Sequence, residues 1–185
     1  MTVGVGTDVR RLNWGCGGEG EPGWINSDRK EGPLIDVCCD IRLGLPLESD
    51  SIDYAVSIHA LPEVPLAEIV PVLAELRRVL RPGGVLRLAL PDLMRGVDAY
   101  RRGDRDYFLI PDDAASSLGG KLVTQLLWYG WSRSLFTPDF VEELLRKAGF
   151  SDVRHVAYRT TSTEHSEIVV LDNRPDESLF VEGVK

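Results

Sequence analysis

The sequence predicts a single α/β domain, residues 1–185, built around a doubly wound and mostly parallel sheet. Short apolar runs of strand length alternate with amphipathic helical stretches. The apolar runs are nearly continuous, as in parallel strands that are covered on both faces. The chain has 185 residues, which is enough for one domain with a proper core but too few for two full domains.

The first half of the chain contains the apolar runs expected to form most of the sheet. The first run leads directly into the glycine-rich stretch Gly15–Gly20, and the next two runs end at Asp28 and Asp40. Glycine and proline residues between the runs mark the turns. We expect strands at Val9–Trp14, Trp24–Ser27, Leu34–Cys39 and Ile52–Ile58.

The stretch Leu66–Leu80 is expected to form an amphipathic helix, because its apolar residues recur every three or four positions. Pro71 lies inside this stretch, so the regular helix is expected to begin or to kink there. Arg81–Gly84 then ends the helix. The following strand, Val85–Leu90, is interrupted only by Arg87.

The C-terminal part is expected to contain one helix and the strands that close the sheet, with an antiparallel strand among them. Thr137 is a suitable N-cap, Pro138 suits the first helical position, and Gly149 ends the helix. The run Ile168–Leu171 fits a short strand or an extended loop equally well. The closing strands are expected at Val153–Tyr158 and Leu179–Val184.

The middle stretch, residues 93–136, does not follow this alternation and is rich in aromatic residues. We expect a helical insertion here. Its rings have two interpretations, an added buried helical layer or a lid over a substrate, and both can hold together. Arginines and aspartates are interleaved in its first part, which is typical of a solvated face of mixed charge.

Charge and composition exclude several classes of function. The net charge of −8 argues against a nucleic-acid partner. No apolar run is long enough to span a membrane, and the N-terminus lacks the apolar core of a signal peptide, so a cytoplasmic location is expected. Cys16, Cys38 and Cys39 show neither a disulfide framework nor a metal-binding spacing, so reduced thiols and no metal are expected.

The glycine-rich stretch allows two ligand classes. Gly15, Gly17 and Gly20 formally match the GxGxxG pattern of dinucleotide sites, in which a helix N-terminus receives the pyrophosphate. Here Glu19 and Glu21 give a poor helix start and would face the phosphates. The acidic loop therefore favours a phosphate-free nucleoside that carries a sulfonium, and a dinucleotide-dependent oxidoreductase is the second possibility.

Several motifs in order along the chain resemble those of class I S-adenosylmethionine-dependent methyltransferases. Leu12–Gly18 is similar to the family's first motif, in the variant where asparagine replaces the usual acid. Pro22–Asp28 resembles the second-strand motif of one predicted-methyltransferase subgroup, and Arg78–Gly84 resembles the segment before the fifth strand. The resemblance covers roughly residues 12–92 and 136–185. It implies a Rossmann-like fold and S-adenosylmethionine as cofactor.

The resemblance also implies roles for individual residues. The glycines would line the methionine part of the cofactor, Asp28 would hold the ribose hydroxyls, and Asp40 would meet the adenine amino group. A carboxylate can accept hydrogen bonds from both kinds of group. The implied cofactor-binding residues are Asn13, Gly15, Cys16, Gly17, Asp28, Asp40, Ile41 and His59.

His59 is the one candidate catalytic residue. It follows the C-terminal end of an expected parallel strand, where open α/β sheets bind their ligands. It could serve as a general base, pack against the cofactor or fill a structural role. The subgroup commonly has a second histidine where this chain has Glu63, and Pro62 intrudes before it, so a catalytic role is not carried over directly.

The expected function is methyl transfer to a small-molecule, sugar or lipid acceptor by in-line displacement, for which alignment matters more than a base. A non-catalytic methyltransferase-like binding protein is the alternative. The connections after the first two strands are too short for helices, so a homodimer or the insertion is expected to cover one face of the sheet. The residues expected to meet the acceptor are Trp128, Tyr129, Trp131 and Arg133.

Overall fold

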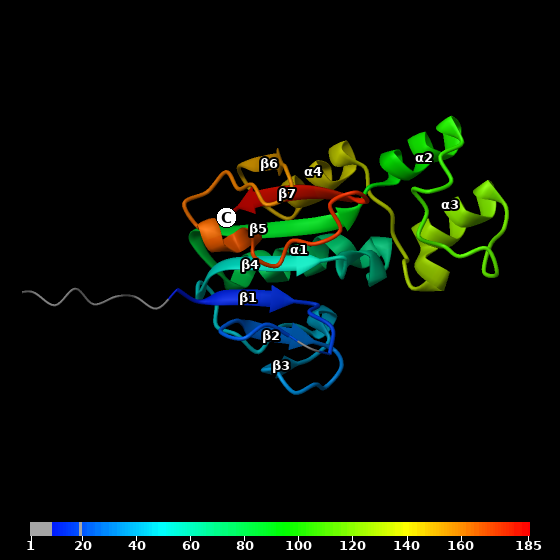
Figure 1. The fold of residues 1–185 in the computed structure, drawn as a ribbon. Coiled ribbons are helices and arrows are strands. Elements are labelled where there is room, and N and C mark those ends of the chain that lie inside the picture. The colour runs from blue at the N-terminus through cyan, green and yellow to red at the C-terminus, as the bar shows by residue number, and fades with distance from the viewer. Residues whose placement is uncertain (1–8, 19) are drawn as a thin grey trace, which may run out of the picture.

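A computed structural model describes residues 9–18 and 20–185, and in these residues it shows one mixed sheet of seven strands in the order β3-β2-β1-β4-β5-β7-β6 (Figure 1). Strands β1 to β5 run parallel, and β7 is antiparallel to both β5 and β6. The strands are β1 (Arg11–Trp14), β2 (Ile25–Asp28), β3 (Val37–Cys38), β4 (Ile52–Ile58), β5 (Leu80–Pro91), β6 (Val153–Val156) and β7 (Ser178–Val184). Glu19, one of the two acids expected in the glycine-rich loop, lies outside the described residues, as do residues 1–8, on which the expectation about a signal peptide partly rests.

Four α-helices and several short 3₁₀ turns complete the described part of the chain. None of these helices combines the length and the apolar character needed to cross a membrane. The helices are α1 (Ile69–Val79), α2 (Leu93–Arg102), α3 (Leu118–Leu127) and α4 (Pro138–Lys147). The 3₁₀ turns are η1 (Ile41–Leu43), η2 (Leu61–Glu63), η3 (Leu66–Glu68), η4 (Trp128–Gly130) and η5 (Ser166–Val169).

Most elements lie where the sequence predicts them, and the differences have local causes. Helix α1 begins at Ile69, so Pro71 falls in its first turn, where a proline is tolerated. The expected strand Leu34–Cys39 is reduced to β3, because a turn closed by Ile35 N–H and Gly32 O occupies its first half. The undecided run Ile168–Leu171 lies in η5 and the loop after it.

The two faces of the sheet are covered differently. On one face α1 and α4 pack against alternate residues of the central strands and enclose the larger core, which includes Leu12, Leu73, Leu86, Leu88 and Leu145. On the other face lies an extended segment with one 3₁₀ turn, residues 157–177, which we call the strap (Figure 1). The expected doubly wound arrangement is therefore incomplete, since the strap occupies the face where a second helical layer would lie.

Buried ion pairs hold the strap on the sheet. Arg87 of β5 is fully buried, and its guanidinium contacts Asp172 of the strap at 2.5 Å and Glu182 of β7 at 2.6 Å. Asp172 also accepts a hydrogen bond from the backbone of Arg159, and Glu182 accepts two from Ser162. The interruption of an apolar strand by Arg87 thus has a structural reason, because this side chain satisfies both carboxylates.

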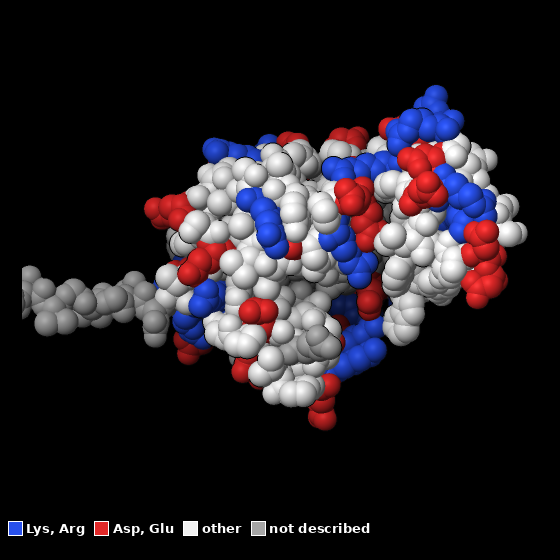
Figure 2. All heavy atoms as spheres, viewed as in Figure 1, with Lys and Arg blue, Asp and Glu red and all other residues white. Residues whose placement is uncertain are grey.

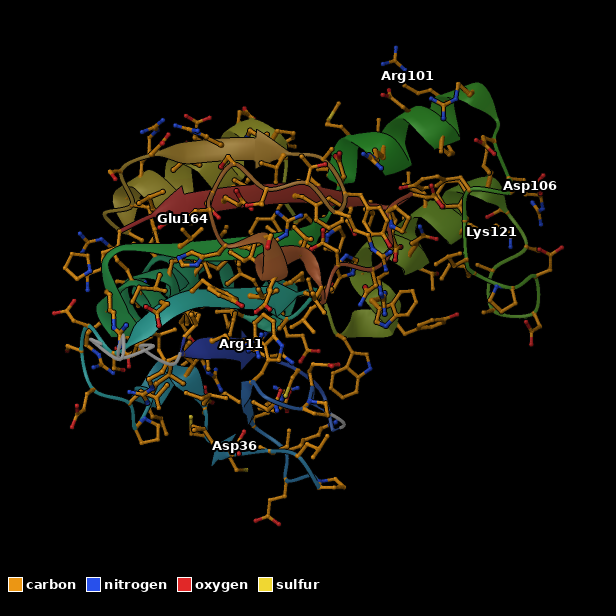
Figure 3. The ribbon with its side chains drawn as sticks, turned by 60° about the vertical axis from the view of Figure 1, so that its left-hand side comes forward. Arg11, Asp36, Arg101, Asp106, Lys121 and Glu164 are labelled. Atoms are coloured by element: carbon orange, nitrogen blue, oxygen red, sulfur yellow. The ribbon has the colours of Figure 1, made fainter. Side chains whose placement is uncertain are left out.

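The insertion forms a separate helical pair at the C-terminal ends of the parallel strands. Helices α2 and α3 pack on each other, and the buried Lys121 donates a hydrogen bond to the carbonyl of Ile110. Arg101 and Asp106 lie on the outer side of this pair, as expected for a solvated face of mixed charge (Figure 3). Phe108 is buried, whereas Tyr129 is 56% exposed. The insertion is therefore more than an added buried layer.

We predict that Arg87→Leu lowers the free energy of unfolding by about 3–5 kcal/mol, because it leaves two buried carboxylates without their partner. Urea denaturation measures this value. The control is Arg146→Leu, which removes an exposed pair with Glu142 on α4 and is expected to cost less than about 1 kcal/mol. Equal and small losses in the two variants would contradict the role given to Arg87.

Candidate functional site

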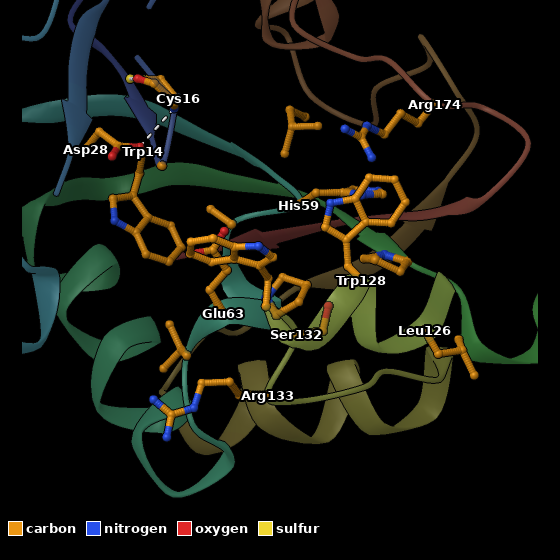
Figure 4. Close-up of a pocket in the computed structure, with 18 of the residues that line it drawn as sticks. Trp14, Cys16, Asp28, His59, Glu63, Leu126, Trp128, Ser132, Arg133 and Arg174 are labelled. Atoms are coloured by element: carbon orange, nitrogen blue, oxygen red, sulfur yellow. Dashed lines mark hydrogen bonds between the residues drawn. The ribbon is translucent and has the colours of Figure 1, made fainter. Parts of the chain in front are cut away.

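A cavity of about 530 Å³ lies between the C-terminal ends of the parallel strands and the insertion. The space-filling view shows a hollow at this place, with charged side chains of both signs around it (Figure 2). The loop after β1, the ends of β2 and β4, the turn after α3 and the end of the strap all contribute residues to its wall (Figure 4). This is the edge at which open parallel sheets bind their ligands.

The glycine-rich loop turns sharply across the ends of β1 and β2. Gly15 has a φ of +68°, and a Cβ there would lie 2.1 Å from the Cβ of Ala60. Gly17 has a φ of +71°, but a Cβ there would meet nothing within 4 Å. Gly15 therefore allows the backbone to pass close to the segment after β4, and Gly17 leaves backbone open to the cavity.

Asp28 stands at the end of β2 beside this loop. Its Oδ2 accepts a hydrogen bond from the backbone N–H of Gly17 at 2.9 Å, and its Oδ1 accepts one from the backbone N–H of Lys30 at 3.0 Å. Each carboxylate oxygen can accept a further hydrogen bond. Asp28 lines the cavity, so it can receive two neighbouring hydroxyl groups there.

Asp40 also lines the cavity, but its carboxylate is already engaged. Both of its oxygens accept hydrogen bonds from the Arg42 guanidinium, and one also accepts from the backbone N–H of Arg42. These contacts hold the pKa of Asp40 below its usual value. Ile41 beside it is buried and contributes apolar surface to the wall.

The structure separates two of the remaining predicted cofactor residues. Asn13 does not line the cavity, since alternate side chains of a strand point to opposite faces and its amide donates a hydrogen bond to Asn26 at 3.1 Å. Asn13 thus contributes no side chain to the cavity wall, and a role in cofactor binding stays a prediction. Cys16 does line the cavity, and burial, together with the charge of Asp28, raises the pKa of its thiol to about 11.

His59 lies in the cavity wall with a left-handed backbone, φ +55°. Its Nε2 is 2.7 Å from the hydroxyl of Ser178 at the start of β7. Burial, with a smaller contribution from the positive charge of Arg174, lowers the pKa of His59 to about 3. The imidazole is therefore neutral at physiological pH and is a weak base.

The turn after α3 closes the cavity from the side of the insertion. Trp131 packs against the cationic groups of Arg29 and Lys30, and Trp128 packs against Arg174 of the strap at 5.6 Å (Figure 4). The backbone N–H of Arg133 donates to the carbonyl of Pro62 at 2.7 Å. Trp128, Trp131 and Arg133 line the cavity, and their contact with an acceptor stays a prediction.

Tyr129 does not join them in the cavity wall and is largely exposed. The backbone of Trp128 and Tyr129 is left-handed at both residues, with φ of +44° and +56°. Consecutive non-glycine residues in this region are strained, and such strain gathers at ligand sites.

Sequence reasoning missed the polar residues at the end of the cavity that is remote from the glycine-rich loop. Asp92, Tyr107 and Glu177 line this end. The position of Asp92 directly after a parallel strand, like that of Asp28, was the one available signal. Within the described ranges, 9–18 and 20–185, no group of three or more His, Cys, Asp or Glu side chains is placed to hold a metal ion.

We predict that Gly15→Ala lowers the free energy of unfolding by more than about 2 kcal/mol, because it adds both a left-handed penalty and a steric clash with Ala60. The control is Gly18→Ala, whose Cβ would meet nothing within 4 Å. Thermal and urea unfolding compare the two variants. A Gly15→Ala protein as stable as the Gly18→Ala protein would contradict the close approach.

The neutral state of His59 makes stability depend on pH. Below its usual pKa of 6.5 the unfolded chain binds a proton that the folded chain, with a pKa of about 3, does not bind. The contribution of His59 to the free energy of unfolding is therefore fully present above pH 6.5. It is lost as the pH decreases from 6.5 towards 3, by at most about 1.4 kcal/mol per pH unit.

His59→Asn removes the titrating group and keeps a residue that tolerates the left-handed backbone. We expect a shallower loss of unfolding free energy in this variant between pH 6 and 4, as measured by urea denaturation at each pH. Identical slopes in the variant and the wild type would show that His59 is not buried in the neutral form.

Comparisons with known proteins agree with this architecture. Residues 13–88 match the family model described as a methyltransferase domain. The structure is similar to a methyltransferase from Thermotoga maritima, with 18% identity over 95% of this chain and 82% of the other and a TM-score of 0.55. It is also similar to one from Mesorhizobium loti, with 18% identity, 96% and 91% coverage and a TM-score of 0.55.

A third similar structure is phosphoethanolamine N-methyltransferase 2 of Haemonchus contortus, which was solved with phosphomonomethylethanolamine and S-adenosylhomocysteine. It shares 14% identity over 97% of this chain and 49% of the other, with a TM-score of 0.54. No curated protein matches this sequence significantly. Residues 13–88 thus match a methyltransferase domain, and the chain has the Rossmann-like fold of the similar methyltransferase structures.

Proposed function

We propose that this enzyme transfers the methyl group of S-adenosylmethionine to a small-molecule acceptor held between the sheet and the insertion. The observation that carries the proposal is the continuity of one cavity. It extends from Gly15, Gly17 and Asp28 at one end to Trp128 and Glu177 at the other. A methyl donor and an acceptor bound at the two ends would meet inside it.

The residues present fit the cofactor. The open backbone at Gly17 leaves room for its methionine part, and the free acceptor positions of Asp28 suit the ribose hydroxyls. Ile41 offers apolar surface to the adenine base. Asp40 can accept a hydrogen bond from the adenine amino group through the acceptor positions that Arg42 does not occupy. When bound, the cofactor supplies a methyl group made reactive by a sulfonium.

The contribution of the protein to the transfer is alignment and the exclusion of water. Displacement needs the acceptor atom, the methyl carbon and the sulfur in line, so orientation supplies most of the rate. The turn around Trp128 and Trp131 contacts Lys30 after β2 and Arg174 of the strap, and in this position it limits the access of water. We assign His59 to orienting the wall through Ser178, since burial opposes the proton uptake that a general base requires.

The cavity supports a small acceptor. Its volume is in the range of small-ligand sites. The net charge of −8 does not suit a nucleic-acid acceptor. Whether the acceptor is a sugar, a lipid or another metabolite stays a prediction, as do a cytoplasmic location and a homodimer. The strap already covers part of the sheet face for which a second subunit was one expectation.

We predict that S-adenosylhomocysteine binds the wild-type protein and that Asp28→Ala weakens this binding by roughly 10- to 100-fold, since two hydrogen bonds to a charged acceptor are lost. Asp40→Ala should weaken it less, because Arg42 already engages that carboxylate. Isothermal titration calorimetry measures each dissociation constant. Asp50→Ala, a surface change at the ion pair with Lys185, serves as the control.

Titrations of this kind, together with turnover assays, distinguish the alternatives. Binding of NADH or NADPH in place of S-adenosylhomocysteine would contradict the proposed function. Binding of S-adenosylhomocysteine without turnover of any acceptor from a broad set of metabolites would favour the non-catalytic binding protein.

A further inference from the structure

The end of the cavity remote from the glycine-rich loop has a chemical character of its own, which bears on the acceptor. This inference rests on the proposed function. Asp92 follows β5 and Glu177 precedes β7, and the pairing of Pro91 with Ser178 places these acids directly opposite each other. The backbone N–H of Asp92 donates to the carbonyl of Glu177 at 2.9 Å, which continues the ladder by one step.

The two carboxylates are largely enclosed, since their side chains are 11% and 12% exposed. Like charges placed opposite each other across antiparallel strands destabilise the pair. Enclosure in a cavity increases this repulsion, because less water screens the charges. A cation bound between Asp92 and Glu177 would relieve it.

The two arginines next to these acids leave part of the hydrogen-bonding capacity of the carboxylates unused. The Nε of Arg95 is 3.5 Å from Asp92 Oδ2, and Arg174 is 3.3 Å from Glu177 Oε1. Both distances exceed the 2.7–2.9 Å typical of charge-assisted hydrogen bonds. Arg95 also donates to the carbonyl of Pro175. Asp92 Oδ1 caps helix α2 and Glu177 Oε1 accepts a hydrogen bond from Arg174, so Asp92 Oδ2 and Glu177 Oε2 keep the most acceptor capacity for a ligand.

Aromatic rings complete this end of the cavity. Tyr107 packs edge-on against Phe108 at 5.2 Å, and Trp128 lines the cavity with the guanidinium of Arg174 over its ring at 5.6 Å. Burial, followed by the negative charges of Glu177 and Asp92, raises the pKa of Tyr107 to about 12, so its hydroxyl stays protonated. Aromatic faces next to carboxylates attract ammonium groups and do not attract anions.

We propose that the methyl acceptor is an amine, that Glu177 and Asp92 hold it against Tyr107 and Trp128, and that the methyl group is transferred to its nitrogen. The two carboxylates then select amines over alcohols and carboxylates of the same shape. Arg133 and Lys30 also line the cavity. We expect them to meet an anionic substituent of the same molecule outside this end.

The step balances with the groups present. The bound ammonium, R–NH₃⁺, gives one proton to the Glu177 carboxylate and becomes the free amine. The nitrogen lone pair then forms the new bond to the methyl carbon as the S–C bond breaks, and its electron pair stays on sulfur. The products are R–NH₂⁺–CH₃ and the neutral thioether S-adenosylhomocysteine, and Glu177 later returns its proton to water.

Three probes of nearly equal shape test the inference: 2-phenylethylamine, 2-phenylethanol and 3-phenylpropanoate. Each is titrated into protein saturated with S-adenosylhomocysteine and, separately, into protein without it. We expect the amine to bind at least about tenfold more tightly than the alcohol, and the carboxylate to bind most weakly. Glu177→Gln should remove this preference and leave the dissociation constant of S-adenosylhomocysteine unchanged.

The matched control is Asp176→Asn, which removes one negative charge from the exposed neighbour of Glu177 and should keep the preference. The inference is overturned if the alcohol or the carboxylate binds as well as the amine, if no amine binding is detected at millimolar concentration, or if Glu177→Gln keeps the preference. A wild-type protein that fails to bind S-adenosylhomocysteine would instead overturn the proposed function, and the titrations without it would still report on amine preference.

Discussion

The buried guanidinium of Arg87 is the interaction on which the rest of this structure depends. A sheet with helices on one face needs a second cover, and here an irregular strap provides it. The strap places Ile168 in the core of this face, and the contacts of Arg87 with Asp172 and Glu182 fix its position on the sheet. Buried ion pairs contribute little net stability, but the loss of one partner is costly, so they fix a unique arrangement more than they strengthen it.

The strap also builds the cavity. Two residues after Asp172 the chain reaches Arg174, which packs on Trp128, and three residues later it reaches Glu177 opposite Asp92. Anchoring the strap at Arg87 therefore positions one wall of the proposed acceptor end, while the glycine-rich loop and Asp28 line the proposed cofactor end from the other half of the sheet. The insertion joins the two ends through the strained turn at Trp128 and Tyr129.

Sequence patterns predict the features that depend on residues close to each other in the chain. The strand Ile52–Ile58, the helix that starts at Pro138 and the turn at Gly15 follow from periodicity, capping and glycine chemistry. Contacts between distant segments are not visible in such patterns. The partners of Arg87 lie 85 and 95 residues away, and Asp92 meets Glu177 only through the register of two strands. The side of the strand on which Asn13 points likewise depends on tertiary packing.

The most direct test of the central claim, one cavity with a cofactor end and an acceptor end, is a crystal structure of the protein with S-adenosylhomocysteine. The account predicts that the ribose hydroxyls contact Asp28, that the amino-acid part follows the backbone at Gly17, and that the sulfur faces the end lined by Tyr107 and Glu177. A nucleoside bound at the end near Glu177, or outside the cavity with Asp28 in contact only with Gly17 and Lys30, would contradict it.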